Sequence, residues 1–488
     1  MAGLAVADEW ERRGGSGALV LEAGPGDDLT HYRASHDESE ALEIWLDPES
    51  DPSFWRPWST SGSAYSGISA LRRRLGGRSL YWHGVSLPIE DWALRDGSWP
   101  PAVVRDLTRS WDGGDSLYDR VTAELTQWAA AGGRQSLDAG PGLRLGPYAF
   151  TPTPQAVRSE PGQETRWAAY SPLAGWRDPA GGLLHRPGVE LITSCLALGV
   201  LVEDDAAVGV RVRRHGATKD IRAHRVVLAA GSVENARLAI QALTEGGRLA
   251  EPELPGLRDK IAHGFTVSFD LGELPPEVAQ AARRGSFLYS PAPERLRSNL
   301  FLSLRLNAFG SAALDVWIMG EQSADASGLV RCTPTPQWPW PVAVEATPSR
   351  EDLALATAQQ TELQTVWDSL SGLLDRPASA LKFDREYGSP DLPRRLLSVQ
   401  NARAASGPIT YSFPLGSEQH DAGTTPFGSL LDDGHQFTAV PGLFAAGPSS
   451  FARTGAANPS LTTLALAKRL GAILAASSPA PAAAASAG

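Results

Sequence analysis

The residues in this chain that are best suited to chemistry are a histidine and an asparagine near its C-terminal end. His420 lies in the segment HDAGTT, and Asn458 precedes Pro459 in the segment TGAANPSL. A histidine has an unperturbed pKa near ~6.5, so it can accept the proton of a hydroxyl group at neutral pH. An asparagine amide can donate a hydrogen bond to an oxygen on which negative charge develops. The simpler interpretations are an exposed loop histidine and a helix-capping asparagine.

The segment that carries the asparagine predicts a strand, a glycine turn and a long helix. Residues 443–446 are apolar, and Gly447 allows a sharp turn. Asn458 and Pro459 suit the N-cap and the first position of the helix that follows. Free N–H groups and the positive end of the dipole at a helix start favour a ligand that becomes negative.

The N-terminal residues indicate an incomplete dinucleotide-binding unit. They predict a helix over 5–13, a glycine turn and a strand over 18–21 that ends at Glu22. A carboxylate in this position can accept hydrogen bonds from an adenosine ribose. The usual fingerprint needs a strand and two more glycines ahead of Gly3, so the sequence predicts a gap in the parallel sheet and half a phosphate site. A start codon assigned too far downstream is the simplest explanation.

Three other regions complete the organisation of the chain. Residues 76–84, GGRSLYWHG, form a loop whose glycines allow a close approach to a ligand. Residues 226–240 form a second strand, turn and helix, with the turn at Gly231. Runs within 297–319 and 341–346 predict an antiparallel sheet under a substrate cavity, and 353–374 has helical periodicity. The tryptophans of this region, Trp317, Trp338, Trp340 and Trp367, are expected in the core more often than at a ligand.

These motifs resemble those of the glucose-methanol-choline (GMC) flavoprotein oxidoreductases. In that family a strand ending in Ala-Gly is followed by Ser-Gly-Ala-Asn-Pro-Thr-Leu-Thr and a long helix, and the catalytic histidine lies three residues before a Gly-Thr. The loop at 76–84 is similar to that of the pyranose-oxidase-like branch, in which a histidine before the tryptophan can carry a covalent flavin. Tyr81 occupies that position here, which implies non-covalent FAD. Pro426 and Phe427 depart from the usual Arg-Met, so the loop behind the histidine is expected to differ.

The resemblance implies an α/β fold with a Rossmann-like FAD-binding domain, built from discontinuous segments, and an α+β substrate domain with an antiparallel sheet. The expected FAD-binding segments are 1–98 and 186–265, with 416–475 as the C-terminal FAD and catalytic segment. The expected substrate-domain segments are 99–185 and 266–415, and residues 476–488 are expected to be a disordered tail.

The implied reaction is oxidation of an alcohol by hydride transfer to FAD. The substrate would be a sugar or another polyhydroxylated small molecule, with His420 as the base and Asn458 orienting the substrate oxygen. Oxygen or another electron carrier would reoxidise the flavin. The residues expected along the cofactor are Gly3, Glu22, Gly24, Gly76, Gly77, Ser79, Trp82, His83, Ala197, Gly231, Gly447, Asn458 and Pro459.

Composition limits the other classes of function. The net charge of -11 and the pI of about 5.4 argue against a nucleic-acid surface. The two cysteines, Cys195 and Cys332, have neither disulfide-framework nor zinc-ligand spacing. No run approaches the ~18 apolar residues of a membrane span, and no signal peptide is evident, so a cytoplasmic protein is expected. The scarcity of lysine reflects a GC-rich bacterial coding bias.

Two rival interpretations remain open. One is a lyase on the same scaffold, which would keep FAD for structure and use His420 as an acid-base group on a cyanohydrin. The other is a truncated, non-catalytic homologue that binds no FAD, suggested by the incomplete N-terminal unit.

Overall fold

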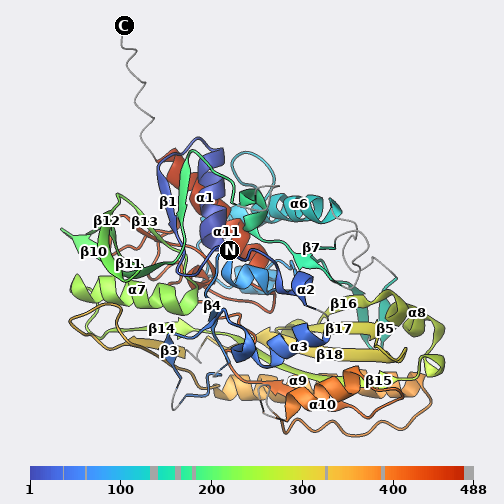
Figure 1. Cartoon of the computed structure of the whole chain (residues 1–488). Coiled ribbons are helices and arrows are strands. Elements are labelled where there is room, and N and C mark those ends of the chain that lie inside the picture. Colours follow the sequence, from blue (N-terminus) through green and yellow to red (C-terminus); the bar gives the residue numbers. More distant parts are fainter. Residues whose placement is uncertain are drawn as a thin grey trace.

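The computed structural model describes residues 1–36, 38–60, 63–66, 68–131, 141–159, 166–177, 183–324, 328–385, 389 and 391–477. Helices and sheets are mixed, as the sequence predicts. Figure 1 shows helices α1 and α11 and the short parallel strands on one side of the molecule, and a broad antiparallel sheet with α9 and α10 on the other.

The parallel strands form two separate pairs. Helix α1 (Ala2–Arg12) leads to β1 (Ala18–Leu21), which pairs with β9 (Val189–Ile192). Strand β13 (Val226–Leu228) pairs with β22 (Leu443–Ala445). Within the described residues each of these sheets has two strands, so β1 and β13 share no ladder. The Rossmann-like character of the domain and the gap expected in its sheet stay predictions.

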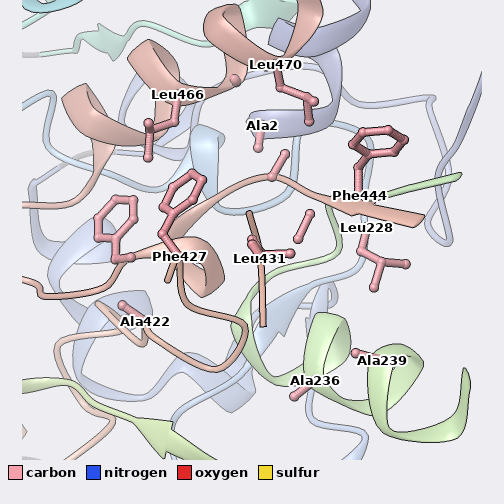
Figure 2. Close-up of a cluster of buried hydrophobic side chains, with 14 of the residues drawn as sticks. Ala2, Leu228, Ala236, Ala239, Ala422, Phe427, Leu431, Phe444, Leu466 and Leu470 are labelled. Carbon is pink, nitrogen blue, oxygen red and sulfur yellow. The ribbon is translucent and has the colours of Figure 1, made fainter. Parts of the chain in front are cut away.

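Helices join the two parallel pairs into one core. Figure 2 shows Ala2 of α1, Leu228 of β13, Ala236 and Ala239 of α7 (Ser232–Glu245), and Leu466 and Leu470 of α11 (Ser460–Ala476) in one apolar cluster. Helices α1 and α11 cross closely at Gly471, where an added Cβ would lie 2.7 Å from the backbone oxygen of Val6. Small residues therefore allow the N-terminal and C-terminal helices to pack together.

The antiparallel sheet has seven strands. Their order across the sheet is β21 (Ile409–Phe413), β15 (Lys260–Phe269), β18 (Ala312–Glu321), β17 (Ser298–Leu306), β16 (Ser286–Pro291), β6 (Tyr148–Pro152) and β5 (Leu143–Leu145). Successive side chains of a strand point to opposite faces. Phe265 and Val267 of β15 face helix α9 (Arg350–Leu373) and share a core with its Val366 and Trp367. Thr266 lies on the opposite face, which lines a cavity.

The remaining elements surround these two layers. They are α2 (Tyr32–Ser35), α3 (Glu38–Leu46), α4 (Asp91–Leu94), α5 (Pro101–Thr108), α6 (Leu117–Ala130), α8 (Pro276–Arg284), α10 (Leu392–Gln400), a sheet of β10 (Cys195–Glu203), β11 (Ala206–Arg214) and β12 (Ala217–Arg222), and the strand pairs β2 (Phe54–Trp55) with β4 (Leu71–Arg72) and β7 (Val157–Arg158) with β8 (Ala168–Ala169). In the described part of the chain, no helix has the length and apolar character required to cross a bilayer.

The structure corrects two expectations about the elements. The run at 341–346 forms β20 (Val342–Glu345), but it belongs to a separate sheet with β14 (Glu253–Leu257), β19 (Gly328–Cys332) and β3 (Trp58–Ser59). Tertiary contacts determine which strands pair, and a local apolar pattern does not specify those contacts. The N-terminal helix begins at Ala2 instead of residue 5. Most of the expected tail, 478–488, and parts of the loop-rich stretch, 132–140, 160–165 and 178–182, lie outside the described residues.

Candidate functional site

A cavity of about 1580 Å³ lies between the parallel strands and the antiparallel sheet. Its walls include the start of α1, the strand β1, the loop at 76–83, and the turn between β13 and α7. Its floor is the face of the antiparallel sheet that carries Thr266 and Trp317. Pockets for small ligands usually measure ~300–1,000 Å³, so this cavity has room for a large ligand and a second, smaller one.

His420 and Asn458 meet at the wall of this cavity. Nε2 of His420 lies 3.4 Å from Nδ2 of Asn458, although 38 residues separate them in the chain. Both residues line the cavity. Nδ1 of His420 and Oδ1 of Asn458 are buried and have no hydrogen-bond partner among the described residues. Buried polar atoms are nearly always paired in native proteins, so these two atoms indicate that a polar ligand group belongs beside them.

The environment of His420 favours its neutral form. Burial, together with the positive charges of Lys260 and Arg78, lowers the pKa of His420 to about 3. A neutral imidazole has one ring nitrogen free to accept a proton. The ring is therefore in the protonation state that a base requires at neutral pH.

Asp259, at the start of β15, holds the segment that carries His420. Its Oδ1 accepts the backbone N–H of His420 at 3.0 Å, and its Oδ2 accepts that of Gly416 at 2.7 Å. Burial and the nearby charge of Asp421 raise the pKa of Asp259 to about 7. Burial also raises the pKa of Glu418, two residues before the histidine, to about 8. The backbone segment that carries the imidazole is therefore held or flanked by carboxyl groups whose pKa values are raised.

Two more carboxylates hold the segment that leads to Asn458. Oε1 of Glu321, at the end of β18, accepts the backbone N–H groups of Thr454 and Gly455 at 3.1 and 2.9 Å. Oε2 of Glu90 accepts the backbone N–H of Ala456 at 2.8 Å. Lys260 pairs with Glu321 in register and donates from Nζ to the carbonyl of Thr454 at 3.4 Å. One corner of the antiparallel sheet therefore positions both members of the candidate pair.

The helix after Asn458 starts one residue later than the sequence predicts. Helix α11 begins at Ser460, and Pro459 occupies the N-cap position with no side-chain cap. The N-cap role expected for Asn458 is therefore wrong. The first backbone bond of the helix, from the N–H of Thr463 to the carbonyl of Pro459, leaves the Asn458 side chain outside the helix and facing the cavity.

The loop at 76–83 is tied to both sides of the cavity. Gly76 and Gly77 adopt φ angles of 96° and 50°, which favour glycine. Ser79 Oγ lies 2.7 Å from Ser171 Oγ. Arg78 donates from Nη1 to Oδ1 of Asp421 at 2.7 Å, so the loop is anchored beside His420.

The aromatic end of that loop also faces the cavity. Trp82 donates from Nε1 to the carbonyl of Tyr170 at 2.7 Å. Nε2 of His83 lies 3.1 Å from the hydroxyl of Tyr32, and both residues line the cavity. His83 is thus held by a partner, and its ring is presented at the wall.

At the other end of the cavity lie the residues expected to contact a dinucleotide. Gly3 is in the first turn of α1, and a Cβ there would lie 3.2 Å from Cβ of Ala229 at the end of β13. Glu22 follows β1, lines the cavity, and accepts the backbone N–H of Gly24 at 2.7 Å. Burial raises the pKa of Glu22. The helix start and this carboxylate therefore form the wall between the two parallel pairs.

The other predicted positions divide into two groups. Ala197, Gly231, Gly447 and Pro459 line the cavity, and Gly231 and Gly447 have φ angles of 90° and 99° at turns that enter helical segments. Gly24 does not: an added Cβ would lie 2.3 Å from the backbone of Arg73 and Arg74. The small size of Gly24 allows its segment to pack against Arg73 and Arg74. Gly24 is not among the residues that line the cavity, so the ligand contact expected for it is not seen in the cavity wall.

Sequence reasoning missed the residues that support the pair. Asp259, Glu321 and Glu90 are far apart in sequence, and no supporting role was expected for any of them. The register of Lys260 with Glu321 brings Asp259 and Glu321 to the same corner of the sheet. It also missed Asp315 and Tyr411, which line the floor of the cavity. A carboxylate within the apolar run LDVWIM was the available signal, because a charged residue inside a buried strand needs a partner or a function.

Comparisons with known proteins identify the fold. No protein-family model matches the sequence, and no curated protein does. The structure is similar to that of pyridoxine 4-oxidase from Mesorbium loti, with 14% identity, 96% of each chain covered and a TM-score of 0.61. It is similar to formate oxidase, with 13% identity, 97% of this chain and 96% of that chain covered, and a TM-score of 0.62. A formate oxidase variant from Aspergillus oryzae, studied for modification of its FAD, gives 12% identity with the same coverage and TM-score.

Proposed function

We propose that this chain, which has the fold of the glucose-methanol-choline flavoprotein oxidoreductases, is an FAD-dependent oxidase of an alcohol. The observation that supports this most directly is the pair formed by His420 Nε2 and Asn458 Nδ2, 3.4 Å apart at the wall of a large cavity. The loop at 76–83, which resembles the flavin-side loop of the family, forms another wall of the same cavity.

The residues present suit the cofactor. The start of α1 with Gly3 offers free N–H groups to a phosphate, and Glu22 offers a carboxylate to a ribose. The loop at 76–83, Gly447 and Pro459 would form the walls beside the ring system. When bound, FAD supplies the acceptor for the hydride of the alcohol carbon.

The side chains at the wall determine what happens to the alcohol proton. Two atoms 3.4 Å apart can both reach one substrate oxygen at the ~2.6–3.2 Å of a hydrogen bond. Neutral His420 accepts the hydroxyl proton at a ring nitrogen. Asn458 donates its amide N–H to the oxygen as negative charge develops, and this hydrogen bond strengthens as the reaction proceeds.

The names of the similar proteins and the state of the two cysteines bear on the electron acceptor and the compartment. Both similar proteins are oxidases by name, so we propose oxygen as the acceptor, with another electron carrier as the alternative. Cys195 and Cys332 are both free and buried, which suits the reducing cytoplasm expected from the sequence.

The test is anaerobic mixing of the FAD-loaded protein with a panel of primary and secondary alcohols, including D-glucose and benzyl alcohol. Bleaching of the oxidised flavin band is the expected result. His420→Ala should slow that bleaching by roughly two to four orders of magnitude, because a general base is lost, while FAD stays bound. His185→Ala, at an exposed position, is the matched control and should leave the rate unchanged.

Two outcomes would count against the proposal. If His420→Ala bleaches at the rate of the wild type, His420 is not the base. If the FAD-loaded protein turns over a cyanohydrin while the flavin keeps its colour, the chain is a lyase.

A further inference from the structure

A second polar pair lies on the floor of the cavity. The hydroxyl of Tyr411 in β21 donates to Oδ1 of Asp315 in β18 at 2.7 Å. These two strands are not neighbours, because β15 lies between them. They meet across Gly264 of β15, where an added Cβ would lie 2.4 Å from the tyrosine ring. The glycine therefore allows the ring to lie across the middle strand and reach the carboxylate.

The carboxylate of Asp315 is placed to bind a ligand. Asp315 pairs in register with Thr266 of β15 and Ser303 of β17, and all three residues line the cavity. A carboxylate has room for about four hydrogen bonds, and Tyr411 fills one of them. Burial raises the pKa of Asp315 to about 6, while the hydrogen bond from Tyr411 and the charge of Arg305 act in the opposite direction. The group is therefore ionised at neutral pH, when it can only accept hydrogen bonds.

An aromatic surface lies between this carboxylate and the His420–Asn458 pair. The rings of Phe301 and Trp317 are 5.3 Å apart and nearly parallel, at 19°, and Phe287 lies 5.5 Å from Trp317 at 23°. All three residues line the cavity. Met319 continues the row and packs in one cluster with Ala457, the residue before Asn458. Rings that stack on one another turn their edges to other neighbours, and an aromatic edge packs favourably against the face of a flat aromatic ligand.

The spacing along β18 sets the length of a ligand that would touch both ends. Met319 marks the end nearest Asn458, and Asp315 lies four residues away with Trp317 between them. At ~3.3 Å per residue these positions are about 13 Å apart. A ligand of roughly 10–13 Å would therefore pass over the aromatic surface from one polar end to the other.

We propose that this floor is a subsite for an alcohol attached to a flat aromatic ring system, and that Asp315, oriented by Tyr411, accepts a hydrogen bond from a donor group at the far edge of that system. This inference rests on the proposed function only for the position of the reacting hydroxyl at His420 and Asn458. Binding of the ring system and its donor group by Trp317 and Asp315 does not depend on any reaction.

The kinetic test compares two alcohols that differ in one group. 4′-(Hydroxymethyl)biphenyl-4-ol carries a phenolic donor roughly 10 Å from its alcohol carbon, and its methoxy ether carries none. Asp315→Asn should raise the KM for the phenol about ten- to a hundredfold, because a hydrogen bond to a charged group is lost, and should leave the ether within threefold. Trp317→Leu should weaken both alcohols equally. Asp270→Asn, on an exposed residue just after β15, is the matched control.

A binding measurement separates this inference from the proposed function. 4-Phenylphenol lacks the alcohol carbon, and calorimetry should show that FAD-loaded wild type binds it more tightly than 4-methoxybiphenyl, a preference that Asp315→Asn removes. If that preference is found but no alcohol bleaches the flavin, the subsite stands and the proposed reaction fails. If alcohols bleach the flavin but Asp315→Asn affects the phenol and the ether alike, the subsite is overturned. Unchanged unfolding temperatures of the variants would show that both results concern binding.

Discussion

Burial fixes the protonation state of His420 before a substrate arrives. The pKa of this imidazole is lowered to about 3, whereas the pKa of Asp259 and that of Glu418 are raised to about 7 and about 8. Both shifts have the same main cause, because an enclosed site disfavours charge of either sign. A histidine in this setting starts as a base, and it binds a proton only when a new negative charge or a polar ligand offsets the cost.

We therefore expect His420 to stay neutral from pH 8 down to pH 5. A lowered pKa means that the proton binds only at more acidic pH, so the imidazole should show no titration in the window where an exposed histidine gains its charge. Carbon-13 NMR of protein labelled at histidine measures this directly, and the spectrum of His420→Gln assigns the signal among the 9 histidines. A midpoint near pH 6.5 would contradict the burial described here.

Among individual residues, the sequence identified those that lie within motifs and missed those that support them. His420 and Asn458 are recognisable because each lies in a short, ordered pattern. Asp259 and Glu321 act through backbone groups of distant segments, and no local pattern encodes such a contact. The N-cap role expected for Asn458 is wrong because the helix begins at Ser460, one residue later than the Asn-Pro pattern predicts.

Strand β15 is the element that organises the site. Asp259, just before the strand, and Lys260, its first residue, hold the two loops of the candidate pair. Its middle glycine admits Tyr411, and its other face packs against α9. The sequence predicted an antiparallel sheet under a cavity, which the structure confirms. It assigned β20 to that sheet wrongly, because apolar alternation identifies strands but does not identify their partners.

For the strands that hold the candidate pair, we predict that Glu321→Ala lowers the free energy of unfolding by about 3–5 kcal/mol. Removal of this carboxylate leaves the two buried backbone N–H groups of Thr454 and Gly455 without their acceptor, and each such loss costs about 1–3 kcal/mol. It also removes one of the two carboxylates that pair with Arg453, which keeps Asp96. Urea unfolding of the FAD-loaded protein measures it. Glu253→Ala removes the partner of Arg331 in an exposed pair and should change stability by less than about 1 kcal/mol. Equal effects of the two variants would show that Glu321 contributes no more than a surface charge.

The cavity lies at the junction of the two parallel pairs and the antiparallel sheet, so a ligand inside it would contact all three. The two parallel pairs have no common ladder in the described part of the chain, and helices provide the packing between them. The sequence did not indicate the size of the cavity, which depends on how the layers pack.

For the molecule as a whole we expect FAD to raise the unfolding temperature. At a hundredfold excess over Kd, binding to the native state alone adds about 2.7 kcal/mol, which corresponds to a few degrees for a chain of this length. Differential scanning fluorimetry with increasing FAD measures the shift. Glu22→Ala should reduce it at equal FAD, and riboflavin, which lacks the adenosine half, should give a smaller shift with no dependence on Glu22. A melting temperature that is independent of FAD would exclude the cofactor.

The glycine at position 264 has an evolutionary consequence. A single base change converts a glycine codon to an alanine codon, and the extra methyl group would force the tyrosine ring of residue 411 off the strand. Such a mutation would change the shape of the cavity floor while leaving the imidazole of His420 in place. Proteins encoded by descendants of this gene can therefore diverge in the ligands they bind without losing this imidazole.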